Sequence, residues 1–189
     1  MIKKKIGEII IQIIPVMIGV YLGFLVSDRA DIKKRKNQSM ILVENILSEM
    51  AANSQKIAGV KDYHIMVMDS SQFYSNPNNK IKRKRLFFQG IRMSALTSSA
   101  YNTGIQTGIL NELPLKKIQA LNELYTQQDS YNDYANMILD GFLNKDFSNN
   151  EEALRKIIQF LSMTMTDVVY KEKSLSEAYE SVTKILEED

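Results

Sequence analysis

The chain has 189 residues, of which 44% are hydrophobic, with no cysteine and one histidine, His64. Without cysteine there can be no disulfide and no thiolate metal site, and a single histidine excludes a typical zinc site. The formal net charge of +2 hides an asymmetry: residues 1–36 hold eight Lys/Arg against three Asp/Glu, whereas residues 93–189 hold eight against fifteen. A basic N-terminal part suggests contact with a negatively charged surface such as an anionic membrane.

The N-terminal segment is apolar enough to cross a membrane. Residues 9–26 read IIIQIIPVMIGVYLGFLV, eighteen positions without a charge. A helix of that length measures roughly 27 Å, close to the ~30 Å hydrocarbon core of a bilayer. We therefore predict a spanning helix over about residues 7–27, inside an anchor of residues 1–36 that includes basic flanks. The alternatives are a cleaved signal peptide, which would have a shorter apolar stretch, and a buried core helix, which would be unusual in so short a chain.

Small and polar residues within this segment indicate helix packing. Gly19, Gly23 and Ser27 are spaced four apart, so they share one face that another helix can approach closely. Glu8 and Gln12 lie one turn apart and are candidates for contact with a partner's spanning helix. For Glu8 the alternative is an interfacial carboxylate that reaches water. The expected partners are the lipid bilayer and other membrane proteins, or further copies of the chain.

Both flanks of the apolar segment are basic, so they leave two orientations open. The lysines at positions 3–5 give the segment the form of an uncleaved signal-anchor, which would place the following domain outside the cell. Arg29 and the basic run 33–36 instead favour a cytoplasmic domain. We expect a single-pass protein of the bacterial inner membrane with its soluble domain in the periplasm, and the cytoplasm is the alternative.

Residues 37–189 carry helical periodicity and no strand pattern of comparable length. Apolar residues recur at spacings near 3.6, which predicts helices over about 37–74, 84–107, 114–143 and 149–187. Asn149 or Asn150 can cap the last of them. Short connections predict an all-α fold in which an antiparallel bundle of about four helices follows the N-terminal transmembrane helix.

The 149–187 stretch has the most regular stripe. Ten positions alternate in steps of four and three, the heptad spacing of bundle and coiled-coil helices, and all but Glu172 are apolar. They are Leu154, Ile158, Leu161, Met165, Val168, Glu172, Leu175, Tyr179, Val182 and Leu186.

Two stretches resemble an uncharacterised family of small single-span bacterial membrane proteins. In the first, an Ile6-Gly7-Glu8 entry leads into a span with Gly19, and the long helix that follows has Glu49 and then Asn53. The second has a hydroxyl-rich helix start, an aromatic, a tight turn and a Leu-x-x-Leu-Tyr end. Its matching residues are Ser99, Tyr101, Gly108-Ile109-Leu110, Leu121, Leu124 and Tyr125. The resemblance implies an anchor and a helical domain, and it implies no activity.

Residue types typical of catalysis are few. His64 falls at the apolar-stripe spacing of the 37–74 helix, so we interpret it as a structural histidine rather than a catalytic base. Asp129, Asp133 and Asp140 lie on the third predicted helix, where a solvated acidic face is favoured over a metal site. No glycine precedes the Lys-Ser/Thr of a phosphate-binding loop. We expect no enzymatic activity and no cofactor.

A basic cluster follows the Asn/Pro-rich turn at 76–79. It consists of Lys80, Lys82, Arg83, Lys84 and Arg85. We favour a solvated turn, with contact to lipid headgroups or an acidic protein as the first alternative. Nucleic-acid binding, with Phe87 and Phe88 stacking on bases, is the least favoured.

These features predict a non-enzymatic accessory or scaffold subunit of a bacterial membrane protein complex. The alternative is a membrane-anchored helical sensor that binds a ligand between its helices, for which the small-residue stretch 98–108 is the candidate lining.

Overall fold

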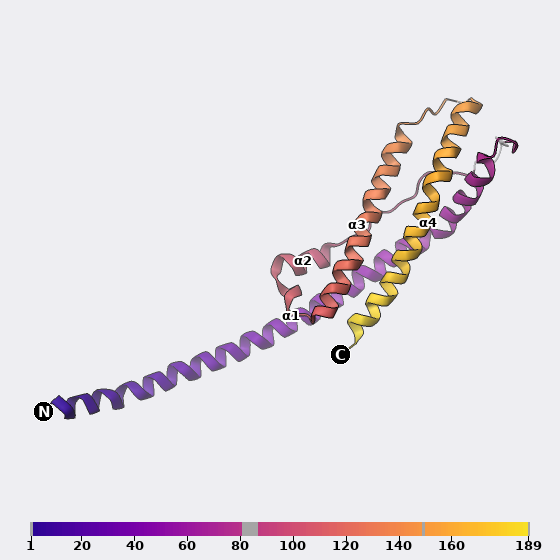
Figure 1. Cartoon of the computed structure of the whole chain (residues 1–189). Helices are drawn as coiled ribbons and strands as arrows, with labels where there is room; N and C mark the ends of the chain where they lie inside the picture. Colours follow the sequence, from indigo (N-terminus) through magenta and orange to yellow (C-terminus); the bar gives the residue numbers. More distant parts are fainter. Residues whose placement is uncertain (1, 81–86, 149, 189) are drawn as a thin grey trace.

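The structure, a computed structural model, describes residues 2–80, 87–148 and 150–188, apart from the side chains of residues 2–14. The described chain is all-α, as predicted, and four helices pack as a bundle. They are α1 (Ile2–Ser75), α2 (Ser99–Thr107), α3 (Leu115–Leu143) and α4 (Glu151–Glu187), and the 3-10 helix η1 (Ile109–Glu112) joins α2 to α3. Figure 1 shows α1 as a long rod whose first half extends away from the bundle and whose second half forms part of it.

The direction of the helices differs from the predicted up-down order. α1 and α3 both run away from the N-terminal end of the molecule, and α4 returns towards it (Figure 1). α4 packs against both α1 and α3 and is antiparallel to each. The core is therefore built from three long helices, and the short α2 and η1 close its lower end.

The predicted second helix, 84–107, is wrong over residues 87–98, which are not helical. Gly90 and Arg92 have φ angles of 99° and 48°, values that a right-handed helix does not contain. This segment lies along the bundle and leads the chain back from the end of α1 to α2 (Figure 1). Its backbone bonds to side chains of α1 and α3, and these bonds replace those of a helix.

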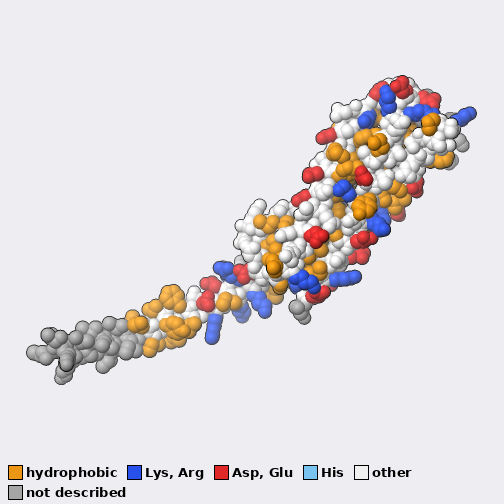
Figure 2. Space-filling view, viewed as in Figure 1, with side chains coloured by type: hydrophobic (Ala, Val, Ile, Leu, Met, Phe, Trp, Pro, Cys, Tyr) orange, Lys and Arg blue, Asp and Glu red, His pale blue; other side chains and the backbone are white. Residues whose placement is uncertain are grey.

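α1 is continuous across the predicted boundary between anchor and bundle at residues 36 and 37. Every side chain from residue 15 to residue 38 is exposed, and Ser39 is the first buried one. We call residues 15–38 the stalk. Figure 2 shows hydrophobic side chains along its first part and charged ones where it meets the bundle.

Within the described residues, no helix has a stretch both long and apolar enough to cross a membrane. The predicted span, 7–27, includes residues 7–14, whose side chains lie outside the described part of the chain.

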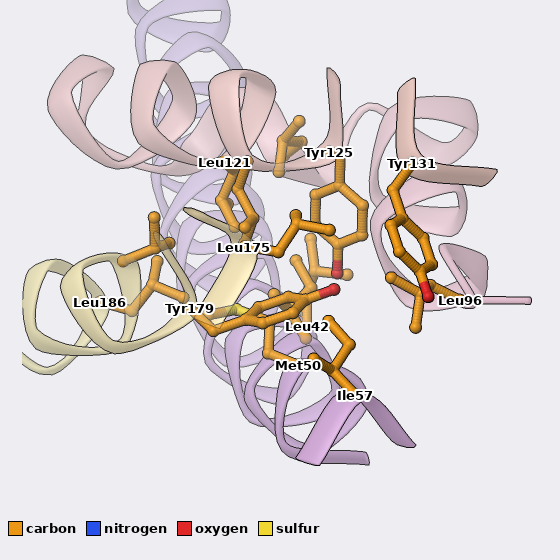
Figure 3. Packing of buried hydrophobic residues seen from close by; sticks show 14 residues of the cluster. Leu42, Met50, Ile57, Leu96, Leu121, Tyr125, Tyr131, Leu175, Tyr179 and Leu186 are labelled. Carbon is orange, nitrogen blue, oxygen red and sulfur yellow. The ribbon is translucent and has the colours of Figure 1, made fainter. Parts of the chain in front are cut away.

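The predicted stripe of α4 forms the centre of the core. Nine of its ten positions are buried; Leu154 is half-buried, and the neighbouring Ala153 is buried in its place. Leucines and tyrosines of α3 and α4 meet Leu42, Met50 and Ile57 of α1 (Figure 3). Each such buried apolar side chain contributes about 1.5–3 kcal/mol, so packing rather than helix propensity holds these helices together. The Asn150 side chain caps α4 by accepting a hydrogen bond from the Ala153 amide at 2.7 Å.

α2 approaches α1 closely at Gly104. A Cβ atom there would lie 2.7 Å from Cδ2 of Leu42, so only glycine fits without a shift of that leucine. The small residues of the 98–108 stretch therefore allow close helix packing at this point.

Candidate functional site

Polar side chains line up inside an otherwise apolar core. Asn53 and His64 of α1, Gln128 of α3 and Glu172 of α4 are all completely buried. With neighbouring polar side chains that bond to them, to one another or to segment 87–98, they form what we call the polar seam. Its members are Glu49, Asn53, His64, Tyr125, Gln128, Tyr131, Asn132, Glu172 and Tyr179.

The upper level of the seam is a buried histidine–glutamate pair. His64 Nδ1 lies 2.6 Å from Glu172 Oε1, and His64 Nε2 lies 3.0 Å from the carbonyl oxygen of Ile91. Since a carbonyl only accepts, Nε2 carries a proton, and one further proton lies between Nδ1 and the carboxyl group. The Tyr131 hydroxyl donates to the same Oε1 at 3.2 Å, while Oε2 of Glu172 is buried without a partner among the described residues. Burial, and then the charge of Glu172, raises the pKa of Tyr131.

The middle level joins all three long helices. Asn53 Nδ2 donates to Gln128 Oε1 at 3.0 Å, and the Tyr179 hydroxyl donates to the same oxygen at 2.6 Å. Burial raises the pKa of Tyr179 far above its ordinary value, so the ring stays neutral and remains a donor. Each amide or hydroxyl in this layer finds a partner on another helix, which offsets the cost of burying it.

The lower level holds the start of α2. Glu49 Oε1 accepts from the Tyr125 hydroxyl at 2.7 Å, and Oε2 accepts from the backbone amide of Ala100 at 2.9 Å. A carboxylate at a helix N-terminus is stabilised by the helix dipole, and it satisfies an amide that has no partner within the helix. Tyr101 stacks on Tyr125 with ring centroids 4.1 Å apart. Burial, followed by the hydrogen bond to Glu49, raises the pKa of Tyr125.

Side chains of the seam clamp the backbone of segment 87–98. Asn132 bonds both ways to Leu96: its Oδ1 accepts from the amide at 2.9 Å and its Nδ2 donates to the carbonyl at 3.0 Å. Asn53 does the same at Thr97, at 3.0 and 2.7 Å. His64 holds the carbonyl of Ile91. These side-chain amides supply the bonds that a neighbouring strand would give, so the segment lies extended against helices.

The interpretation of His64 as structural agrees with its buried position. Sequence reasoning did not assign a role to its partner, although the signal was present: Glu172 is the one charged residue in the α4 stripe. Asp129, Asp133 and Asp140 are exposed, as a solvated face requires. Within the described residues, no three His, Asp or Glu side chains come together in a way that could hold a metal ion.

The predicted membrane contacts lie apart from the seam. Gly19 and Gly23 have no atom within 4 Å of the position where a Cβ would stand, and Ser27 is exposed. The side chains of Glu8 and Gln12 lie outside the described residues. Lys80 is exposed and follows the end of α1 at Ser75, while Lys82, Arg83, Lys84 and Arg85 are outside the described part.

Two stretches singled out in the sequence, at residues 49–53 and at residues 97–125, meet in space. Glu49 and Asn53 of the first stretch bond to Ala100, Thr97 and Tyr125, which lie in or beside the second. Comparison of the chain with models of protein families, with curated proteins and with solved structures finds no match.

Proposed function

We propose that the chain is a membrane-anchored accessory or scaffold subunit that projects a rigid helical bundle from a bacterial inner membrane. The observation that carries this proposal is the stalk. Val16, Met17, Val20, Leu22 and Phe24 are each more than half exposed on a helix that continues directly into the bundle core. Exposed apolar residues on consecutive turns need an apolar environment on every side. A lipid bilayer supplies that, whereas one partner helix would cover one face only.

The proposed span joins the undescribed side chains of residues 7–14 to these exposed turns. From Ser27 to Ser75, α1 rises roughly 70 Å at 1.5 Å per residue. The bundle would therefore present its far end well beyond the headgroup layer. Lys80 follows the end of α1 that lies farthest from the stalk, which favours an acidic protein over the anchoring membrane as the partner of Lys80. The proposal includes no role for nucleic acid.

Membrane extraction tests the anchor. We expect the full chain to sediment with membranes and to resist an alkaline wash, and Ile18→Lys with Leu22→Lys to release it, because two charges in the hydrocarbon core cost several kcal/mol, about 2.5–3.5 each. The matched control is Met163→Lys with Tyr170→Lys, since these side chains are 76% and 73% exposed on α4. Release of the control, or retention of the stalk variant, would argue against the anchor.

Cross-linking in cells tests the scaffold role. Among the described residues, nothing outside the local helix backbone lies within 4 Å of a Cβ placed at Gly19 or Gly23, so their shared face is open to another spanning helix. We expect a defined set of membrane proteins to co-purify, and Gly19→Leu with Gly23→Leu to lose them while the chain stays in the membrane. Tyr21→Leu with Leu25→Met, on the opposite face of the same turns, should retain the partners. Recovery of the chain alone, or cross-linked only to itself, would count against a heteromeric complex.

The proposed orientation places the bundle in the periplasm. Because the chain has no cysteine, a single Met163→Cys substitution on exposed α4 gives one labelling site. Labelling of intact cells by a membrane-impermeant maleimide supports the periplasmic side. Labelling only after the cells are opened would place the bundle in the cytoplasm instead.

The sensor alternative receives less support from the geometry. Gly104 of the 98–108 stretch packs against Leu42, and Glu49 and Tyr125 close around the start of α2. These contacts fill the place proposed for a ligand.

A further inference from the structure

The structure has a hollow of about 710 Å³ at the base of the bundle, where the stalk enters it. One wall is the α1 face that carries Ile32, Lys36 and Met40. The other walls come from the corner between η1 and α3, around Leu113, and from Leu186 at the end of α4. We propose that this hollow binds an anionic phospholipid of the membrane in which the chain is anchored. The inference rests on the anchor proposed above.

The lining of the hollow is amphiphilic. Apolar side chains of Val43, Leu113 and Leu186 form part of its walls. Ile32 and Met40 also line it and are 58% and 49% exposed, although they lie beyond the predicted span. An acyl chain would cover these carbons, and a small soluble anion would leave them in water.

Cations stand at the same hollow. Arg35 pairs with Glu112 at 3.0 Å, and Lys117 Nζ donates to the carbonyl oxygens of Leu186 and Glu188 at 2.9 and 2.6 Å. Both are held in place by these bonds. Lys36 makes no ion pair with any described residue, so its ammonium group is free to meet a phosphate. The remaining acid, Glu44, lies eight residues beyond Lys36 along α1.

The lower edge of the hollow, at Ile32, lies at the height of the headgroup layer. Ile32 is five residues beyond Ser27, which is roughly 8 Å along the helix. Headgroup regions extend roughly 5–8 Å beyond the hydrocarbon core on each side. This lower edge would therefore face the phosphates of lipids beside the stalk, and Met40, roughly 20 Å beyond Ser27, would be reached only by a lipid bound in the hollow. Arg29, Lys33 and Lys34 are exposed on the stalk just below it and would draw anionic lipids to the same place.

Because the chain has no tryptophan, the fluorescence of one introduced tryptophan reports on the hollow alone. The full chain with Met40→Trp is reconstituted into nanodiscs that contain either phosphatidylglycerol or phosphatidylcholine with the same brominated acyl chains. We expect the phosphatidylglycerol to quench the tryptophan more strongly. Adding Lys36→Gln should lower that preference roughly fivefold, the effect expected of one cation at an anionic surface. Lys33→Gln, a stalk cation that does not line the hollow, should lower it much less.

Two outcomes would overturn the proposal separately from the anchor. Equal quenching by both lipids would leave the hollow without a lipid preference. Equal effects of Lys36→Gln and Lys33→Gln would reduce the result to general attraction between the stalk and the membrane. If the chain does not enter nanodiscs or float with vesicles, the anchor and the lipid site both fail. A tryptophan placed by Met163→Trp on the exposed face of α4 should show no quenching by either lipid.

Discussion

His64 and Glu172 are 108 residues apart in sequence, and their Nδ1 and Oε1 atoms are 2.6 Å apart in a completely buried contact between α1 and α4. The same imidazole reaches the carbonyl of Ile91 with its other nitrogen. The pair thus joins α4, α1 and the extended segment at one point. Because it satisfies polar groups that a different helix register would leave without partners, we infer that it selects this register.

Removing the glutamate should be costly. Glu172→Ala leaves His64 and the Tyr131 hydroxyl without their shared acceptor, and we expect a loss of about 3–5 kcal/mol in the free energy of unfolding. Glu172→Gln should lose less, because the amide can still bond to a neutral imidazole. The control is Glu177→Ala, exposed on the same helix, with an expected change within about 0.5 kcal/mol. Urea unfolding of the full chain in detergent, followed by circular dichroism, measures all three. Similar midpoints for Glu172→Ala and Glu177→Ala would refute a stabilising role.

The buried tyrosines predict a loss of stability at high pH. Burial raises the pKa of Tyr125, Tyr131 and Tyr179 in the folded chain, while unfolding returns each to about 10. The stabilisation is complete below the unfolded value and declines as the pH rises above it, because the unfolded chain then releases protons that the folded chain retains. Each ring should contribute a decline of about 1.4 kcal/mol per pH unit. Ultraviolet titration of the phenolates should show one cooperative step that coincides with unfolding.

Tyr179→Phe tests whether the buried tyrosines cause the loss of stability at high pH. The variant loses one hydrogen bond to Gln128, and its stability should fall less steeply with pH by the share of one ring, about 1.4 kcal/mol per pH unit. An unchanged slope would mean that the buried phenols do not govern alkaline unfolding.

Asn53 should control the order of the extended segment. Asn53→Ala removes the bonds to both the amide and the carbonyl of Thr97, and we expect a loss of about 1–3 kcal/mol together with faster amide exchange across residues 87–98. Asn136→Ala, an exposed substitution on α3, is the matched control. Hydrogen-exchange mass spectrometry compares amide protection across residues 87–98 in the Asn53→Ala and Asn136→Ala variants. Protection that is equal in both variants would show that the clamp is dispensable.

Two glycines in helices should respond oppositely to alanine. Gly59 of α1 has open space at its Cβ position, so Gly59→Ala should stabilise the chain by about 0.5–1 kcal/mol through helix propensity. Gly104→Ala gains the same propensity but must displace Leu42, so we expect no net gain or a loss. The thermal unfolding midpoints of the two variants, compared with that of the unsubstituted chain, measure these changes in stability. An equal gain at both positions would mean that α2 does not approach α1 as closely as described.

The helical class, the stripe of α4 and an asparagine cap at the start of α4 could be predicted from the sequence, because these depend on periodicity and on residues close in the chain. The sequence also singled out Glu172 as an exception without explaining it. Only the tertiary structure showed that residues 87–98 are extended and that α1 and α3 run parallel. Helix propensity in that segment is overridden by backbone bonds to Asn53 and Asn132, which lie more than thirty residues away. Periodicity can place a polar residue on a buried face, but it does not say which distant group the residue pairs with, so the clamp and the His64–Glu172 pair become visible only when the helices are packed together.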